Sequence, residues 1–177
     1  MRTLVTGGVR SGKSRHAEML LAGAGRVTYV APGPATDAEQ DAWGDWAERI
    51  AAHRAGRPPA WSTVETHDLA AALAGDGPVL VDCLGTWLTA LLDEHEQWEA
   101  PVVEATALVR AEVDRARAAL LARTADTVLV TNEVGLGVVP AHRSGRLFRD
   151  LLGLVNQEVA SACDEVHLVI AGRVLTL

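Results

Sequence analysis

The sequence predicts an α/β protein with a mostly parallel sheet flanked by helices, and three observations support this. Short apolar runs alternate along the chain with longer stretches of helical periodicity. The first apolar run leads into a glycine-rich turn and then into a helix-forming segment. No linker or repeat divides the 177 residues, so we expect residues 1–177 to form a single domain with a continuous core.

Seven short runs are predicted to be strands, because they are apolar, rich in β-branched residues and bounded by turn residues. The last of them, Arg173–Leu177, is expected to fold back through Gly172 as an edge strand. The other six are Thr3–Thr6, Val27–Ala31, Ser62–Glu65, Val79–Cys83, Thr127–Thr131 and Val166–Ala171.

Four longer stretches are predicted to be helices: Ser14–Ala22, Thr36–His53, Val102–Arg123 and Arg143–Cys163. The second begins with Thr36 and Glu39, a Thr-x-x-Glu capping box that satisfies free N–H groups at a helix start. The third and fourth carry apolar residues on one stripe, so we expect them to cover the sheet. A further apolar stripe, interpreted as core, is formed by Trp87, Leu88, Leu91 and Leu92.

Composition argues against several classes of protein. The net charge is −7 and the sixteen basic residues form no dense tract, so nucleic acid is not an expected partner. No apolar run is long enough for a membrane span, and the first residues lack the pattern of a signal peptide, so we expect a cytoplasmic protein. The two cysteines, Cys83 and Cys163, match no metal or disulfide spacing and are interpreted as packing residues.

One motif carries a specific chemical prediction. It consists of Gly7, Gly8, Val9, Arg10, Ser11, Gly12, Lys13 and Ser14, a complete match to the P-loop pattern G-x-x-x-x-G-K-[ST]. Glycines let backbone N–H groups point inward around phosphate oxygens, and the following helix adds the positive end of its dipole. Lys13 is expected to bridge the β- and γ-phosphates of ATP or GTP, and Ser14 to bind Mg²⁺. The fold class is thereby narrowed to a P-loop NTPase-like sheet.

A second magnesium ligand is predicted at Asp82, which ends the apolar strand Val79–Val81. An ordinary acidic cap after a strand is the alternative. Asp82 and Gly85 also fit D-x-x-G, a loose pattern of GTP-dependent switches. The guanine-reading Asn-Lys-x-Asp of such switches is missing, because Thr131-Asn-Glu-Val-Gly135 follows the later strand, and the switch hypothesis is weakened.

A transferase is favoured by His53, which is the last residue of the second predicted helix and lies in sequence among Arg49, Arg54 and Arg57. Neutral imidazole attacks activated phosphorus readily, and the phosphoramidate that forms is labile. The arginines could neutralise charge that develops on the phosphoryl oxygens. His53 also falls three residues after Ile50 on the apolar stripe of the helix, so a purely structural histidine is the alternative.

Four segments together resemble one family. They are residues 7–18, the run His53-Arg-Ala-Gly-Arg-Pro, residues 131–140 (Thr-Asn-Glu-Val-Gly-Leu-Gly-Val-Val-Pro) and residues 149–157 (Arg-Asp-Leu-Leu-Gly-Leu-Val-Asn-Gln). Over essentially its whole length the chain resembles the bifunctional adenosylcobinamide kinase / adenosylcobinamide-phosphate guanylyltransferase family of cobalamin biosynthesis. The last three segments are far more specific than the P-loop alone.

The resemblance implies two coupled reactions and a homotrimer. The family phosphorylates adenosylcobinamide with ATP or GTP. It then transfers GMP from GTP to adenosylcobinamide phosphate through a guanylylated histidine, which aligns with His53, and forms adenosylcobinamide-GDP. Beyond residues 7–14, the implied nucleotide-binding positions are Ala31, Pro32, Gly33, Arg54, Ala55, Gly56, Arg57, Glu65 and Asp82.

The chain departs from the family pattern in two places. Ala31-Pro32-Gly33-Pro34 stands where the family usually has Ala-Thr-Ala, and the two prolines stiffen this loop and remove N–H donors. The stretch Asp37–Glu48 is longer than the family's usual run. Both changes leave His53 in place but bear on the nucleotide contacts.

Several polar residues keep more than one interpretation. Glu65 could accept hydrogen bonds from guanine or ribose, or be a solvated acid at a strand end. Asn132 and Glu133 end another strand, where α/β ligand sites gather, and could orient the substrate or only cap the next turn. One face of the last long helix could be an anion-binding wall, a subunit contact or a solvated face; it carries Arg143, Arg146, Arg149, Gly153 and Asn156.

Two functions compete with the bifunctional transferase. A single-step small-molecule kinase would use the P-loop alone, with His53 in a structural role. A GTP-dependent binding module would bind a partner and turn over no cobinamide.

Overall fold

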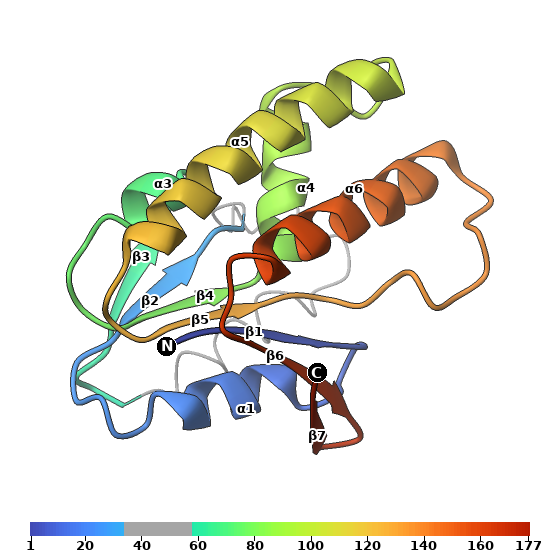
Figure 1. Cartoon of the computed structure of the whole chain (residues 1–177). Coiled ribbons are helices and arrows are strands. Elements are labelled where there is room, and N and C mark those ends of the chain that lie inside the picture. The colour runs from blue at the N-terminus through green and yellow to red at the C-terminus, as the bar shows by residue number, and fades with distance from the viewer. Residues whose placement is uncertain (34–57) are drawn as a thin grey trace.

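A computed structural model describes residues 1–33 and 58–177, and the strands in this part of the chain form one seven-stranded sheet (Figure 1). The strands are β1 (Arg2–Gly7), β2 (Thr28–Ala31), β3 (Ser62–Glu65), β4 (Val79–Asp82), β5 (Thr127–Val130), β6 (Glu165–Ile170) and β7 (Arg173–Thr176). Their order is β3-β2-β4-β5-β1-β6-β7, and only the β6–β7 pairing is antiparallel. The predicted P-loop NTPase-like α/β fold with a C-terminal edge strand is confirmed.

The described helices are α1 (Lys13–Leu20), α3 (Leu69–Ala72), α4 (Leu84–Glu94), α5 (Val102–Ala122) and α6 (Arg143–Ala160). Three of the four predicted helices are therefore present, and the predicted helix Thr36–His53 lies outside the described residues. Helices α3 and α4 were not predicted from the sequence pattern. Helix α3 has four residues, too few for a helical period, and seven of the eleven residues of α4 are buried, which blurs its polar face.

Strand side chains alternate between two cores, one on each face of the sheet. Leu4 and Leu129 belong to the core shared with α3, α4, α5 and α6. Their neighbours Val5 and Val128 belong to the core shared with α1. Figure 1 shows α1 on one face and the other four labelled helices on the opposite face. The predicted sandwich of helix, sheet and helix is confirmed for the described residues.

The parallel pairing aligns the strand ends along two edges. The carboxyl edge is formed by the ends of β3, β2, β4, β5 and β1, and it carries Glu65, Ala31, Asp82, Val130 and Gly7 in that spatial order. We call the opposite side, where these strands begin, the amino edge. Because loops at the carboxyl ends of parallel strands build ligand sites in such folds, the carboxyl edge positions the candidate site. Within residues 1–33 and 58–177 no helix is both long and apolar enough to cross a bilayer.

Candidate functional site

The predicted phosphate loop joins β1 to α1 in the expected strand–turn–helix order. The loop turns through a Ser11 N–H to Gly8 C=O hydrogen bond of 3.3 Å. Gly12, at the N-cap of α1, has a φ of 95°, in the left-handed region that favours glycine. The chain therefore enters the helix directly from the loop, and the first-turn N–H groups of α1 lie at the end of β1.

Neighbouring atoms leave no room for a side chain at Gly7. A Cβ built on Gly7 would lie 2.4 Å from the Val169 carbonyl oxygen and 2.7 Å from Ser11 Oγ. The Gly172 N–H donates to the Ser11 carbonyl oxygen at 2.8 Å, so the β6–β7 turn supports the loop from outside. These contacts explain why the first position of the motif requires glycine.

The loop also presents polar side chains. Lys13 Nζ lies 3.4 Å from the Gly8 carbonyl oxygen, which places the ammonium group over the loop itself. The Ser11 hydroxyl is buried and has no hydrogen-bond partner among the described residues. Ser14 lies half-buried in the first turn of α1. The structure therefore brings the predicted residues 7–14 together around one turn.

Asp82 ends β4, two strands from β1 across β5. Its Oδ2 accepts a hydrogen bond from the Tyr29 hydroxyl at 3.2 Å. Among the described residues no group of three or more His, Cys, Asp or Glu could hold a metal ion. Mg²⁺ commonly takes one or two protein oxygen ligands, several waters and substrate phosphates, so the oxygen donors of Ser14 and Asp82 suit that ion.

The segment Ala31–Gly33 follows β2 at the same edge. Ala31 pairs with Glu65 across β2 and β3, and Pro32 is buried. The Gly33 carbonyl oxygen lies 3.3 Å from His67 Nε2, and a Cβ on Gly33 would lie 3.3 Å from Thr86 Cβ. The departure from the family pattern thus places its first proline in the protein interior and its glycine against α4.

Glu65 lies at the far end of the carboxyl edge, four strand steps from β1. At about 4.8 Å per step this corresponds to roughly 19 Å, a span comparable with an extended nucleoside triphosphate. Its side chain is exposed. The remaining predicted site residues, His53, Arg54, Ala55, Gly56 and Arg57, lie outside the described residues.

The D-x-x-G pattern does not form a switch loop. Gly85 lies in the first turn of α4, directly after β4. Cys83 forms the N-cap of this helix, where its N–H donates to Thr86 Oγ1 at 3.3 Å. Burial, followed by the negative charge of Asp82, raises the pKa of the Cys83 thiol. Cys83 is therefore a neutral hydrogen-bonding group, and its packing interpretation is incomplete. Both cysteines are free thiols.

The three arginines on the basic face of α6 contact neighbouring loops, a role that the sequence interpretations did not include. Arg143 donates to the Trp98 and Ala100 carbonyl oxygens. Arg146 donates to the Pro140 and Ala141 carbonyl oxygens, and Arg149 to the Gly135 carbonyl oxygen. Each arginine thus anchors the backbone of a neighbouring loop.

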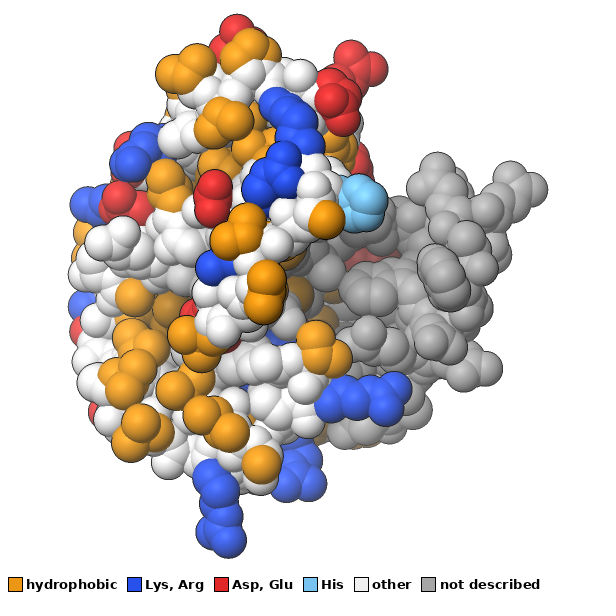
Figure 2. Space-filling model, turned by 90° about the vertical axis from the view of Figure 1, so that its right-hand side faces the viewer, with side chains coloured by type: hydrophobic (Ala, Val, Ile, Leu, Met, Phe, Trp, Pro, Cys, Tyr) orange, Lys and Arg blue, Asp and Glu red, His pale blue; other side chains and the backbone are white. Residues whose placement is uncertain are grey.

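One of these anchored loops, residues 134–140, follows β5 beside the phosphate loop, and its base is joined to β1 by a Glu133 N–H to Gly7 C=O bond of 3.1 Å. Two of its side chains are strongly exposed, Leu136 at 87% and Val138 at 95%. Figure 2 shows the side of the molecule on which this loop lies, where hydrophobic side chains are interspersed with basic ones.

Behind the phosphate loop, His16 of α1 contacts His167 of β6. His16 Nε2 lies 2.9 Å from His167 Nδ1, and His167 Nε2 lies 3.0 Å from Glu165 Oε2. Burial, with a smaller effect from His167, lowers the pKa of His16. The neutral form of His16 is therefore favoured, as expected for a packing contact between helix and strand.

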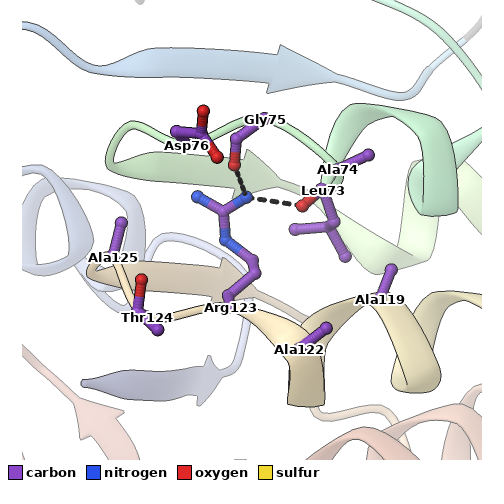
Figure 3. Close-up of a pocket in the computed structure, with 9 residues that line it drawn as sticks. All are labelled: Leu73, Ala74, Gly75, Asp76, Ala119, Ala122, Arg123, Thr124 and Ala125. Carbon is purple, nitrogen blue, oxygen red and sulfur yellow. Dashed lines mark hydrogen bonds between the residues drawn. The ribbon is translucent and has the colours of Figure 1, made fainter.

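A separate pocket of about 300 Å³ lies at the amino edge, far from the phosphate loop (Figure 3). The Arg123 guanidinium enters it from the end of α5. Arg123 donates to the carbonyl oxygens of Leu73 at 2.5 Å and Gly75 at 2.6 Å, to the Gly77 carbonyl oxygen, and through Nε to Thr127 Oγ1 at 2.7 Å. Because the Arg123 N–H groups donate to these carbonyl and hydroxyl oxygens, we interpret the role of this pocket as structural.

The sequence is also similar to known proteins. The family described as cobinamide kinase / cobinamide phosphate guanyltransferase matches residues 3–177. The bifunctional adenosylcobalamin biosynthesis protein CobU of Salmonella typhimurium is 43% identical over 183 residues, with 97% of each chain covered. CobU of Escherichia coli is 41% identical with the same coverage, and CobP of Pseudomonas aeruginosa is 39% identical over 100% of this chain and 97% of that protein.

Proposed function

The chain belongs to the cobinamide kinase / cobinamide phosphate guanyltransferase family, and from this premise we propose that one nucleotide site at the carboxyl edge serves both reactions. The protein is a bifunctional enzyme of adenosylcobalamin biosynthesis, acting as cobinamide kinase and as cobinamide-phosphate guanylyltransferase. The similarity over nearly the whole chain supports this function over a single-step kinase and over a non-enzymatic binding module.

The kinase reaction transfers the γ-phosphoryl group of ATP or GTP to the hydroxyl of adenosylcobinamide. The hydroxyl oxygen attacks the γ-phosphorus and loses its proton to solvent, the bond to the bridging oxygen breaks, and the nucleoside diphosphate leaves. The proposed role of the phosphate loop is to hold the phosphates with its backbone N–H groups while Lys13 balances their charge. The position of Lys13 over the loop, 3.4 Å from the Gly8 carbonyl oxygen, supports this assignment.

In the guanylyl transfer, His53 is the proposed nucleophile. A neutral imidazole nitrogen attacks the α-phosphorus of GTP, the bond to pyrophosphate breaks, and a phosphoramidate forms. A phosphate oxygen of adenosylcobinamide phosphate then attacks the same phosphorus, the P–N bond breaks, and adenosylcobinamide-GDP is released. Arg54 and Arg57 are proposed to balance the charge. The motif around His53 and the family membership support these roles.

The nucleotide is proposed to lie along the carboxyl edge, with its terminal phosphates between the phosphate loop and Asp82, over the end of β5, and its base towards β2 and β3. Ala31, Pro32, Gly33 and Glu65 would then contact the base or ribose. The arrangement of these strand ends in one row supports this orientation. Asp82 ends β4, which lies in the sheet between β1 and the pair of β2 and β3.

Mg²⁺ is the proposed cofactor, held by the Ser14 hydroxyl and the Asp82 carboxylate. The ion would neutralise charge on the nucleotide phosphates. The Tyr29 hydroxyl, through its hydrogen bond to Asp82 Oδ2, would fix the orientation of the carboxylate.

We also propose a cytoplasmic homotrimer, on the basis of the family resemblance. Sedimentation equilibrium of the purified protein should give the mass of three chains. A mass of one chain at micromolar concentration would contradict the trimer. Fractionation of the source cells should recover the protein with the cytoplasm, and recovery with membranes would contradict that location.

The nucleophile can be tested by labelling with GTP that carries its label on the α-phosphate. Wild type should form an acid-labile, base-stable adduct, and His53→Ala should form none while it retains the kinase reaction. His95→Ala, which removes an exposed histidine after α4, is the matched control and should label like wild type. An adduct that persists in His53→Ala would show that another residue carries the GMP.

A further inference from the structure

The turn after β5 lies between the two strand ends that carry the proposed phosphate and magnesium ligands. In the sheet β5 pairs with β4 on one side and with β1 on the other, and Val130 is in register with both Asp82 and Val5. Asn132 follows two residues later. Residue 132 therefore follows the strand that separates Asp82 from the phosphate loop.

The backbone of this turn is fixed from α6. Asn156 Nδ2 donates to the Asn132 carbonyl oxygen at 3.1 Å, and the Thr131 hydroxyl donates to Asn156 Oδ1 at 2.6 Å. Both polar atoms of the Asn156 side chain are thus used to hold residues 131 and 132. On the other side, the Glu133 N–H donates to the Gly7 carbonyl oxygen at 3.1 Å.

The amide of Asn132 is also oriented. The Cys83 thiol donates to Asn132 Oδ1 at 3.5 Å. A Cβ on Gly85 would lie 3.2 Å from the same oxygen, so glycine leaves room for the amide against the start of α4. Because the oxygen faces Cys83 and Gly85, the Nδ2 end is directed away from them. The amide N–H groups have no hydrogen-bond partner among the described residues.

The neighbouring Glu133 is different. Its Oε1 accepts a hydrogen bond from the Gly135 N–H at 2.5 Å, so its carboxylate caps the next turn. Of these two polar residues after β5, Asn132 is therefore the one whose side-chain donors are unused among the described residues.

We propose that the Asn132 amide donates a hydrogen bond to the terminal phosphate of the bound nucleoside triphosphate, and that Asn156 and Cys83 are positioning residues for it. This inference rests on the proposed nucleotide site. A triphosphate on the phosphate loop, with a metal held by Ser14 and Asp82, would have its terminal phosphate over the end of β5, because β5 separates β1 from β4. A neutral amide donor suits that place, because a carboxylate would repel the phosphate oxygens.

The test compares binding of guanosine 5′-(β,γ-imido)triphosphate and of GDP, each with Mg²⁺. A hydrogen bond to a charged group contributes about 1.5–3 kcal/mol, or roughly 10–150-fold in affinity. Asn132→Ala should lose at least about 10-fold in triphosphate affinity, and Asn132→Asp should lose more because of charge repulsion. GDP affinity should stay within about twofold of wild type in both variants.

Three results would overturn the inference. They are unchanged triphosphate affinity in Asn132→Ala, an equal loss of GDP affinity, or unchanged nucleotide affinity with a raised KM for adenosylcobinamide. The last result would assign Asn132 to the acceptor. Thermal unfolding of each variant checks that the nucleotide is offered to a folded protein, and Asn132→Ser, which keeps a donor, provides a second test if Asn132→Asp does not fold.

The positioning residues have matched variants. Cys83→Ser keeps a donor for Asn132 Oδ1 and should keep the ratio of triphosphate to GDP affinity, whereas Cys83→Ala and Asn156→Ala should lower this ratio. A variant that only loses stability would change the triphosphate and GDP affinities together. An unchanged ratio in Cys83→Ala and Asn156→Ala would therefore refute a positioning role.

Failure of the proposed function gives a different pattern. A wild-type protein that binds both nucleotides but converts no adenosylcobinamide would contradict the function, and the affinity ratio would still test Asn132. A wild-type protein that carries out both reactions, with a ratio insensitive to position 132, would contradict this inference alone.

Discussion

The two edges of the sheet use their polar side chains in opposite ways. At the amino edge the N-terminal ammonium group pairs with Asp126 at 2.8 Å, Arg2 pairs with Asp164 at 2.6 Å, and Arg123 donates to backbone carbonyls. At the carboxyl edge the Ser11 hydroxyl and the Asn132 amide N–H groups have no partners among the described residues. One edge is therefore closed by its own contacts, and the other keeps donors for a ligand.

The largest expected difference is in kcat, between a variant that loses a basic side chain at the carboxyl edge and one that loses a basic side chain at the amino edge. Lys13→Ala is expected to lower kcat of both reactions on the order of 10²–10³-fold, because a preorganised charge next to the transferred phosphates is lost. Arg26→Ala removes an exposed arginine just before β2, at the amino edge, and should stay within about twofold of wild type. Steady-state kinetics with ATP and with GTP measures both. Near-normal activity in Lys13→Ala would contradict the assignment of the phosphate loop.

Two adjacent glycines offer a matched pair within the carboxyl edge. Gly7→Ala places a methyl group 2.4 Å from the Val169 carbonyl oxygen and should destabilise the protein by about 1–3 kcal/mol and disturb nucleotide binding. Gly8→Ala meets no protein atom within 4 Å, so it should leave the free energy of unfolding unchanged. Urea unfolding and nucleotide titration of both variants measure the difference. Equal behaviour of the two would show that the contact with β6 does not shape the loop.

The amino edge should respond in stability and not in chemistry. Arg123→Leu leaves backbone carbonyls without their donors and should cost about 1–3 kcal/mol of unfolding free energy, with kcat unchanged at a temperature where the variant is folded. As a comparison away from this edge, Arg115→Ala removes the ion pairs of a half-exposed arginine with Asp68 and Glu112 and should cost less than about 1 kcal/mol. A specific loss of kcat in Arg123→Leu would mean that the amino-edge pocket serves the reaction.

The smallest effect is expected at the ion pair of Arg2 and Asp164. The hydrogen bonds from Arg2 lower the pKa of Asp164 to about 2, from an ordinary value of 3.8. A lowered pKa in the folded state means that the stabilisation is complete above pH 3.8 and is lost as the pH falls towards 2. Asp164→Asn should therefore unfold at a lower temperature than wild type at pH 7, and the two should converge near pH 2. A constant difference across that range would contradict the contribution of this pair.

Much of the fold was predictable because its signals are local. All seven strands lie where the apolar runs predicted them, with ends that differ by one or two residues at most. The same holds for residues 7–14, since the motif, the preceding strand and the following helix are contiguous in sequence. Helix α4 was recognised only as an apolar stripe, because burial on most sides removed the polar face that reveals a helix.

The arrangement around Asn132 could not be predicted, because it depends on contacts between residues far apart in sequence. Asn156 lies 24 residues from Asn132 and contacts it only because α6 packs against the end of β5. The sequence showed that the arginines of α6 share one face, but not that they donate to carbonyl oxygens of loops, because it does not reveal the course of those loops. Spacing along a helix shows which residues share a face, but not what that face meets.

The central claim, that one site serves both reactions, can be tested by competition in the wild-type protein. The β,γ-imido analogue of ATP should inhibit γ-phosphoryl transfer from ATP and adduct formation from α-labelled GTP competitively, with the same inhibition constant. Inhibition of phosphoryl transfer with unimpaired adduct formation would contradict the claim, because it would require a second nucleotide site.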